Sequence, residues 1–230
     1  MGKRGVKAKG KVKIRWSPDF AYGLGLLVTD GCLYRRGTYV NFTSKDKELI
    51  EHFLKAFSLS CRVGKKSSRS KQEKKYFFVQ FGDIRFGAFL QGIGITENKT
   101  KTIGELAIPE KYFFDFLRGH LDGDGCTYSY FDPRWRSSFM FYTVFVSASK
   151  EHIEWLRSLI FKKLGIKGHV TKNGNGVVYQ LKYAKKESLK ILKKMYYSDD
   201  VLCLSRKREK IREMFVTAGL DKYMPRWRNW

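Results

Sequence analysis

Cysteine is scarce and scattered in this sequence of 230 residues. The four cysteines (Cys32, Cys61, Cys126 and Cys203) include no C-x-x-C pair, and the four histidines form no spaced cluster with them. A zinc module needs closely spaced sulfur or imidazole ligands, and a disulfide framework needs more cysteines in a shorter chain. We therefore expect reduced thiols in an intracellular protein. The compartment, a bacterial cytoplasm or an organelle, stays open.

Long apolar runs are also missing. No stretch of about 18 apolar residues occurs, and the basic opening "MGKRGVKAKGKVKIRW" leads into no apolar segment. A membrane span and an ordinary secretory signal are therefore not expected. Apolar residues still make up 43 % of the chain, which is ordinary for a folded domain. We expect a soluble protein whose residues 1–14 form a basic N-terminal arm.

Acidic residues are outnumbered by basic ones. The chain has 22 Asp and Glu against 46 Lys and Arg, which gives a formal net charge of +24. Such an excess favours a polyanionic partner. Aromatic residues interleave with the charge in stretches such as "KKYFFVQFG", a composition that suits strands carrying a nucleic-acid surface. A merely solvated basic surface is disfavoured, because the charge recurs along the whole chain instead of forming one tail.

The chain contains an internal repeat. The segment "YGLGLLVTDGC" (Tyr22 to Cys32) aligns with "FLRGHLDGDGC" (Phe116 to Cys126) at one constant offset. Their shared positions are Gly25 and Gly119, Asp30 and Asp124, Gly31 and Gly125, and Cys32 and Cys126. Downstream, "VNFTSKDKELIEHFLKAF" resembles "VFVSASKEHIEWLRSLIF", and an alternating strand followed by helical spacing occurs in each copy. A repeat of this kind determines the architecture.

We predict an α+β protein made of two pseudo-symmetric αββαββα repeats. Ser17, Pro18 and Asp19 form a good helix start for the first copy, and Pro109 with Glu110 does so for the second. The "NGNG" at residues 173–176 is a strong hairpin turn. The expected boundaries are the arm at 1–14, the first repeat at 15–98, a linker at 99–110, the second repeat at 111–215 and a tail at 216–230.

Both repeated helices carry an interior glycine and end in an acid. Glycine costs about 1 kcal/mol relative to alanine inside a helix, so Gly25 and Gly119 indicate a close helix crossing. Asp30 and Asp124 would then lie side by side at the negative ends of the helix dipoles, with the glycines that follow them as left-handed caps. Two such carboxylates repel each other unless a hard divalent cation such as Mg²⁺ lies between them.

An isolated turn or a calcium loop would also explain one acidic tip. A calcium loop starting at Asp122 would need an oxygen ligand and a glycine where Cys126 and Thr127 stand, so that pattern fails. A bare turn explains one copy of the motif but not two aligned copies. The paired-acid interpretation is therefore preferred.

The two segments resemble the signature helices of the LAGLIDADG homing endonucleases, in the single-chain, two-motif form. The resemblance covers nearly the whole chain and implies a saddle of antiparallel sheets over DNA, with the motif helices at the interface between the halves. It makes Asp30 and Asp124 the metal-binding, catalytic acids, together with Gly31 and Gly125 in the metal site. The first motif departs from the family pattern at Val28, which stands where the second has Asp122.

The activity that the resemblance implies is site-specific hydrolysis of one phosphodiester in each strand of double-stranded DNA, with intron homing as its setting. The expected cofactor is Mg²⁺, with Mn²⁺ as a substitute and Ca²⁺ supporting binding without cleavage. The target would be long and nearly asymmetric, and the protein a monomer. The family places a lysine near each acid, for which Lys99 (with Lys101 as fallback) and Lys207 are the candidates; plain phosphate contact explains any single lysine about as well.

Strand residues facing away from the helices should read the major groove. Alternation in "YFFVQFG" and "VVYQLKY" directs Tyr76, Phe78, Gln80, Gln180 and Lys182 outward. Gln80 aligns with Lys182, so the two halves would read different half-sites. Basic residues in turns or near strand ends are further candidates for DNA contact: Arg35, Arg36, Lys65, Lys66, Arg69, Lys71, Lys74, Lys75, Arg134, Arg136 and Lys172.

Two other functions remain open. One is an intron RNA-splicing maturase of the same fold, and the other is a DNA-binding regulator that does not cleave. The presence of both Asp30 and Asp124 favours the enzyme, because a pure binder would gain by losing two acids that face phosphate.

Overall fold

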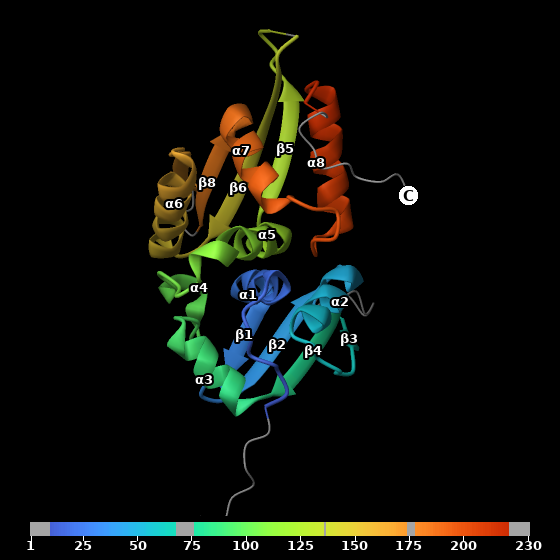
Figure 1. Ribbon diagram of the computed structural model, residues 1–230, viewed down its shortest axis with the longest axis vertical. Helices are drawn as coiled ribbons and strands as arrows, with labels where there is room; N and C mark the ends of the chain where they lie inside the picture. Colours follow the sequence, from blue (N-terminus) through green and yellow to red (C-terminus); the bar gives the residue numbers. More distant parts are fainter. Residues whose placement is uncertain (1–9, 68–75, 136, 174–177, 221–230) are drawn as a thin grey trace, which may run out of the picture.

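The computed structural model describes residues 10–67, 76–135, 137–173 and 178–220. Two four-stranded antiparallel sheets lie at opposite ends of the molecule, with two helices, α1 and α5, side by side between them (Figure 1). The chain therefore has the predicted α+β architecture of two similar halves.

The first half runs through four helices and four strands. Its elements are α1 (Pro18–Asp30), β1 (Gly31–Tyr34), β2 (Tyr39–Ser44), α2 (Lys47–Ala56), β3 (Gly64–Lys66), β4 (Tyr76–Gly82), α3 (Ile84–Gly92) and the short α4 (Lys99–Thr102). The second half repeats this order after a 3₁₀ turn at Glu110–Tyr112. Its elements are α5 (Phe113–Gly123), β5 (Cys126–Phe131), β6 (Phe139–Ser147), α6 (Lys150–Leu164), β7 (His169–Lys172), β8 (Tyr179–Ala184), α7 (Lys185–Met195) and α8 (Ser205–Thr217).

The sheets share one topology and one register. Their strand orders are β1-β2-β4-β3 and β5-β6-β8-β7, all antiparallel. In the first sheet Cys32 lies opposite Asn41, which lies opposite Gln80. In the second, Cys126, Val144 and Lys182 make the equivalent row. Gln80 and Lys182 align in the sequence, and they therefore also lie at matching points of the two sheets.

Local chemistry explains where the helices begin. Ser17 accepts a hydrogen bond from the Phe20 amide (3.1 Å) and Pro18 occupies the first turn, as the sequence predicts. In α2 the buried positions Leu49, Ile50 and Phe53 recur at helical spacing and cover one face of the first sheet. None of the described helices is long and apolar enough to cross a membrane.

The predicted left-handed caps after the motif helices are wrong. Gly31 is extended (φ −86°, ψ 155°), and Gly125 is not among the described glycines that have a positive φ. The chain passes directly from α1 into β1, and from α5 into β5 after two residues, so no reversal is needed. Glycine is required for space instead, because a Cβ on Gly31 would lie 2.9 Å from the Leu27 Cα, and one on Gly125 would lie 2.7 Å from the Leu121 Cα.

The described part of the N-terminal arm is attached to the first half. The amides of Lys11 (2.5 Å) and Val12 (2.9 Å) both donate to the Asp83 carboxylate, which also caps α3 through the Phe86 amide (3.0 Å). Val12 is buried. Residues 1–9 lie outside the described residues.

Candidate active site

The site is built on the contact between α1 and α5. These two helices approach so closely that glycine is needed at the crossing. A Cβ on Gly25 would lie 2.6 Å from the His120 nitrogen, and a Cβ on Gly119 would lie 2.9 Å from the Tyr22 carbonyl carbon. Because both helices run to their C-terminal ends beyond this crossing, the crossing brings their acidic ends together.

Asp30 and Asp124 stand at these ends, and the charge of Asp124 acts on Asp30. Burial raises the pKa of Asp30 to about 6, with the negative charge of Asp124 as the second cause. Burial also raises the pKa of Asp124, although its side chain is exposed on the surface of the site. The Thr29 hydroxyl donates weakly to Asp30 (3.4 Å). The two carboxylates therefore form a negatively charged centre whose repulsion the protein compensates only in part.

Two lysines supply that partial compensation. Lys99 Nζ, on α4, donates to the Gly31 carbonyl at the end of α1 (2.7 Å). Lys207 Nζ, on α8, donates to carbonyl oxygens at the end of α5, those of Leu121 (2.6 Å), Asp122 (2.8 Å), Gly123 (3.2 Å) and Gly125 (2.7 Å). Each ammonium group occupies the negative end of a helix dipole. Both lysines lower the pKa of Asp30 and of Asp124 against the effect of burial.

Lys99 and the fallback candidate Lys101 differ in burial. Lys99 is buried with 6 % of its surface exposed, whereas Lys101 is exposed. Burial lowers the pKa of Lys99, and the negative charges of Asp124 and Asp30 oppose that shift. Of these two lysines, only Lys99 places its ammonium group at the end of a motif helix. The segment assigned to a linker, residues 99–110, thus contains a residue of the site.

Asp122 is bound inside the protein instead of facing the site. It is fully buried and accepts hydrogen bonds from the Tyr22 hydroxyl (2.9 Å) and the Leu204 amide (2.7 Å). Burial raises the pKa of Asp122 to about 6, and the hydrogen bond from the Leu204 amide is the largest cause that lowers it. Asp122 thereby joins α1, α5 and the start of α8. Asp122 therefore has a structural role, and the first motif has Val28 at the matching position.

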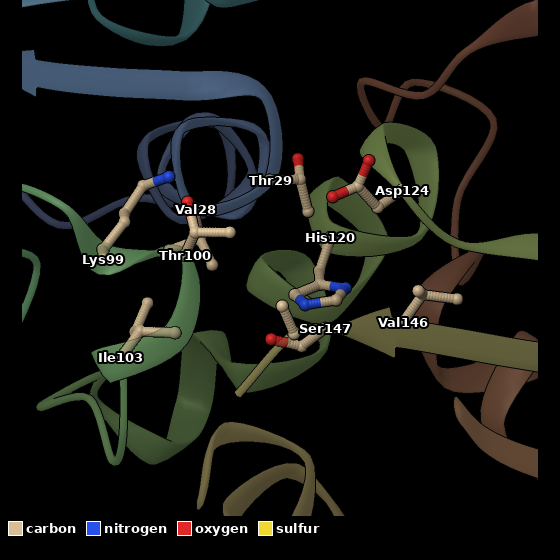
Figure 2. Close-up of a pocket in the computed structure, with 10 residues that line it drawn as sticks. Val28, Thr29, Lys99, Thr100, Ile103, His120, Asp124, Val146 and Ser147 are labelled. Atoms are coloured by element: carbon tan, nitrogen blue, oxygen red, sulfur yellow. The ribbon is translucent and has the colours of Figure 1, made fainter. Parts of the chain in front are cut away.

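A pocket of about 50 Å³, open in part to solvent, lies beside Asp124. Figure 2 shows Lys99 on one side of it, Asp124 on the other, and the His120 ring between Asp124 and Ser147. Burial lowers the pKa of His120 well below its usual value, so this ring is a neutral wall of the pocket. The pocket therefore provides polar space next to Asp124 that water can enter.

The outward faces of the two sheets contain the predicted base-reading residues. In β4 the side chains of Val79 and Phe81 are buried while Gln80 is exposed. Tyr76 and Phe78 share the Gln80 face and are half-buried. In β8 the side chains of Leu181 and Tyr183 are buried, which leaves Gln180 and Lys182 on the opposite face.

Tyrosines on the same outward faces were missed by the sequence reasoning. Tyr142 of β6 stacks between Tyr128 (ring centroids 5.0 Å apart) and Tyr130 (6.1 Å) of β5. By register, Tyr34 and Tyr39 occupy the places of Tyr128 and Tyr142 in the first sheet, and their rings are 5.5 Å apart. Alternation in "CTYSYF" contains this signal, since Tyr128 and Tyr130 lie two and four residues after Cys126.

The basic candidates lie around the rims of the sheets. Arg35 and Arg36 form the exposed β1–β2 turn with positive φ, and the Arg35 guanidinium lies 4.7 Å from the centre of the Tyr39 ring. Lys66 donates to the Thr43 hydroxyl (3.1 Å). Arg134 is held by an ion pair with Asp132 (3.1 Å). Lys65 and Lys172 are exposed. The remaining candidates lie outside the described residues: Arg69, Lys71, Lys74, Lys75 and Arg136.

No protein-family model and no curated protein match this sequence. Solved structures do match in shape. The homing endonuclease I-WcaI bound to its DNA recognition sequence is 13 % identical over 92 % of this chain and 94 % of its own, with a TM-score of 0.59. I-DmoI in complex with DNA and Ca is 13 % identical over 85 % of this chain and 97 % of its own, with a TM-score of 0.56. The chain has the LAGLIDADG homing-endonuclease fold.

The LAGLIDADG fold is not confined to proteins named as endonucleases. The N-terminal LAGLIDADG domain of DUF199/WhiA is 15 % identical over 86 % of this chain and 88 % of its own, with a TM-score of 0.53. The comparisons therefore establish the fold, and the activity has to be argued from the site. The two segments that resemble the signature motif form α1 and α5.

The donor set of the site fits a hard divalent cation. No cluster of three or more His, Cys, Asp or Glu side chains suited to a metal occurs among the described residues. The protein thus offers the two carboxylates of Asp30 and Asp124, and the remaining ligands would be water and substrate oxygens, which is how Mg²⁺ is commonly bound. The Gly31 and Gly125 carbonyls accept hydrogen bonds from Lys99 and Lys207. The carboxylates would therefore be the principal ligands.

Proposed function

We propose that this protein is a site-specific endonuclease that hydrolyses one phosphodiester in each strand of a double-stranded DNA target with the help of divalent metal, Mg²⁺ or Mn²⁺. The observation that carries the proposal is the pairing of Asp30 with Asp124, each beside a lysine-capped helix end, at the point where the two halves meet. DNA-bound structures of the same fold support duplex DNA as the substrate.

The residues of the site divide the work. Asp30 and Asp124 would hold the metal, which supplies an activated water and polarises the scissile phosphate. Lys99 and Lys207 place fixed positive charge next to the acids, where negative charge grows on the phosphate as the bond breaks. Because one acid comes from each half, each half would direct the cut in one strand.

The two sheets would select the DNA sequence. Gln80 and Lys182 occupy matching positions but differ in chemistry, since an amide both donates and accepts while an ammonium only donates. Asn41 and Val144 next to them differ as well. A target read by these rows would have unlike half-sites. The tyrosine rows at equivalent places would add contacts that the half-sites share.

Cleavage of a randomised duplex library tests the proposal. The protein and its Asp124→Asn variant are incubated with the library in Mg²⁺ and in Ca²⁺, and both cut ends and bound fragments are sequenced. We expect discrete double-strand cuts by the parent in Mg²⁺, binding without cutting in Ca²⁺, and no cuts by Asp124→Asn. Asp200→Asn makes the same chemical change at an exposed residue after α7 and should cut like the parent.

The library also separates the alternatives. Specific binding by the parent in both metals without any cut would refute the nuclease and leave a DNA-binding regulator of the same fold. Absence of specific duplex binding, combined with specific binding of an intron RNA, would replace the nuclease by the maturase.

A further inference from the structure

A row of lysines follows one exposed face of α7. Lys186, Lys190 and Lys194 recur every fourth residue, and all three are exposed. Residues four apart on a helix are neighbours, so the row brings like charges together and opposes helix formation. Within the described residues, none of these three side chains has a hydrogen bond or an ion pair. The row is therefore an uncompensated strip of positive charge.

The strip points away from the sheet. The opposite side of α7 buries Ser188, Ile191, Leu192 and Met195 and packs against β6, β8 and α5. Figure 1 shows α7 lying across these strands on the helical side of the second half. Lys182, by contrast, points to the other face of the same sheet. A duplex bound on the outward face of the sheet would leave the α7 strip free.

The fold itself does not require these charges. Helix α3 follows the fourth strand of the first half, as α7 follows the fourth strand of the second, and "IRFGAFLQG" contains the single basic residue Arg85. Helix α7 contains five lysines in "KKESLKILKKM". Its one acid, Glu187, accepts a hydrogen bond from the Gly168 amide (3.4 Å). The two repeats therefore share the helix but not the charge.

We propose that the face formed by Lys186, Lys190 and Lys194 binds a second DNA duplex through its phosphates. Lysine offers a compact point charge, which suits contact with phosphate oxygens. Successive lysines of the row are separated by about 6 Å of helix axis, so the row can follow a phosphate backbone. The inference rests on the proposed function for the first duplex. A second duplex held this way can replace the first by direct transfer, which would speed the search for a rare target.

Competitor-dependent dissociation tests the inference. A short labelled duplex is bound to the protein, and its dissociation rate is measured as unlabelled duplex is increased. The parent should release the label several-fold faster at high competitor concentration. The triple variant Lys186→Gln, Lys190→Gln, Lys194→Gln should show a rate that does not depend on competitor. Its affinity for the labelled duplex should change by less than about twofold, because the altered charges lie on the opposite side of the sheet from its outward face, where salt screens them.

A charge-matched variant separates the row from general charge. Lys55→Gln, Lys111→Gln, Lys210→Gln removes the same number of exposed charges from three other elements and should behave like the parent. A parent whose rate ignores competitor, or a control that matches the row variant, would refute the inference. Single-stranded RNA that accelerates release more than duplex DNA does would refute duplex DNA as the occupant.

Stoichiometry distinguishes this failure from failure of the proposed function. The parent should bind two short duplexes per chain, and the α7 variant one. If Gln80→Ala and Lys182→Ala leave duplex affinity unchanged, the sheet face is not the first site and the proposed function is at fault. If those variants weaken binding but the parent still binds only one duplex, the α7 inference alone is wrong.

Discussion

At the scale of single residues, the lysines of the site combine structural and electrostatic roles. Lys207 satisfies backbone carbonyls at the end of α5 that have no partner within the helix, while Lys99 bonds to one carbonyl. The carboxylates at the negative helix ends are tolerated because these ammonium groups stand beside them. Removing either lysine should therefore affect both folding and chemistry, but to different extents.

Lys207→Met should destabilise the protein by about 2–3 kcal/mol, and Lys99→Met by about 1–2 kcal/mol, because the first leaves more buried carbonyls without a donor. Both should abolish or strongly reduce cleavage. Lys101→Met, an exposed change beside Lys99, should alter stability by no more than about 0.5 kcal/mol. Urea unfolding of the four proteins measures this order. Equal losses for Lys207→Met and Lys101→Met would contradict the capping role.

His152 provides a pH test at the same scale. Burial lowers its pKa to about 4, and its Nδ1 lies 2.9 Å from the Gly104 carbonyl. Because the folded pKa lies below the unfolded value, the neutral ring contributes fully above about pH 6.5, and that contribution is lost as the pH falls toward 4. The variant His152→Leu copies Leu49 at the matching position of α2. It should reduce the loss of unfolding free energy over this pH range by up to about 3 kcal/mol. If the unfolding free energy of the parent and of His152→Leu depends on pH in the same way, the lowered pKa of His152 is contradicted.

At the scale of elements, the crossing of α1 and α5 controls the site. A Cβ on Gly119 would meet the Tyr22 carbonyl carbon at 2.9 Å and the Gly25 Cα at 3.2 Å. These contacts are with backbone atoms, so no side-chain movement can relieve them. The helices would have to separate, and with them the acids.

Gly119→Ala should therefore cost at least about 2–3 kcal/mol of stability and reduce cleavage. Gly92→Ala is its control, since a Cβ on Gly92, at the end of α3, has nothing within 4 Å. That change should be neutral or stabilise by up to about 1 kcal/mol through helix propensity. Thermal unfolding of both variants checks the contrast, and a Gly119→Ala protein as stable as Gly92→Ala would show that the crossing can loosen freely.

At the scale of the whole molecule, polar contacts between the two halves fix their relative position. Glu48 on α2 accepts from the Ser205 amide (3.1 Å) at the start of α8, and Arg206 pairs with Asp46 (2.8 Å). A further contact between the halves is the hydrogen bond that the Ser149 hydroxyl donates to the Ile103 carbonyl. These cross-connections keep Asp30 and Asp124 together although they repel. Folding of the halves and formation of the site are thus coupled.

Metal should stabilise the whole protein. The pKa of Asp30 is raised to about 6, so its ionisation opposes folding increasingly as the pH rises from about 4 to 6, and the full cost is present at neutral pH. At neutral pH, Asp124→Asn should raise stability in the absence of metal by about 1–2 kcal/mol, less than the full shift because the site opens to solvent. Ca²⁺ should raise the unfolding temperature of the parent and not of Asp124→Asn. An equal rise in both would place the metal elsewhere.

The repeat and the elements that build it follow from the sequence alone. Matching glycines and acids in two segments, alternating strands and the Ser17 cap predicted an α+β chain of two similar halves, and the observed sheets have one topology. Such features are local, since they depend on backbone propensity and on which face of an element is apolar. The order of the elements and the pairing of the motif helices could therefore be predicted.

The tertiary structure was needed to place the individual charged side chains. Lys207 follows Asp124 by many residues, yet its ammonium group lies on the end of α5, while Lys101 beside Lys99 stays exposed. Asp122 carries a carboxyl like its neighbour Asp124 but is buried against Tyr22 and Leu204. The caps were mispredicted because the turn after each helix depends on the path into the next strand. Contacts between distant segments arise from packing, and no local pattern encodes them.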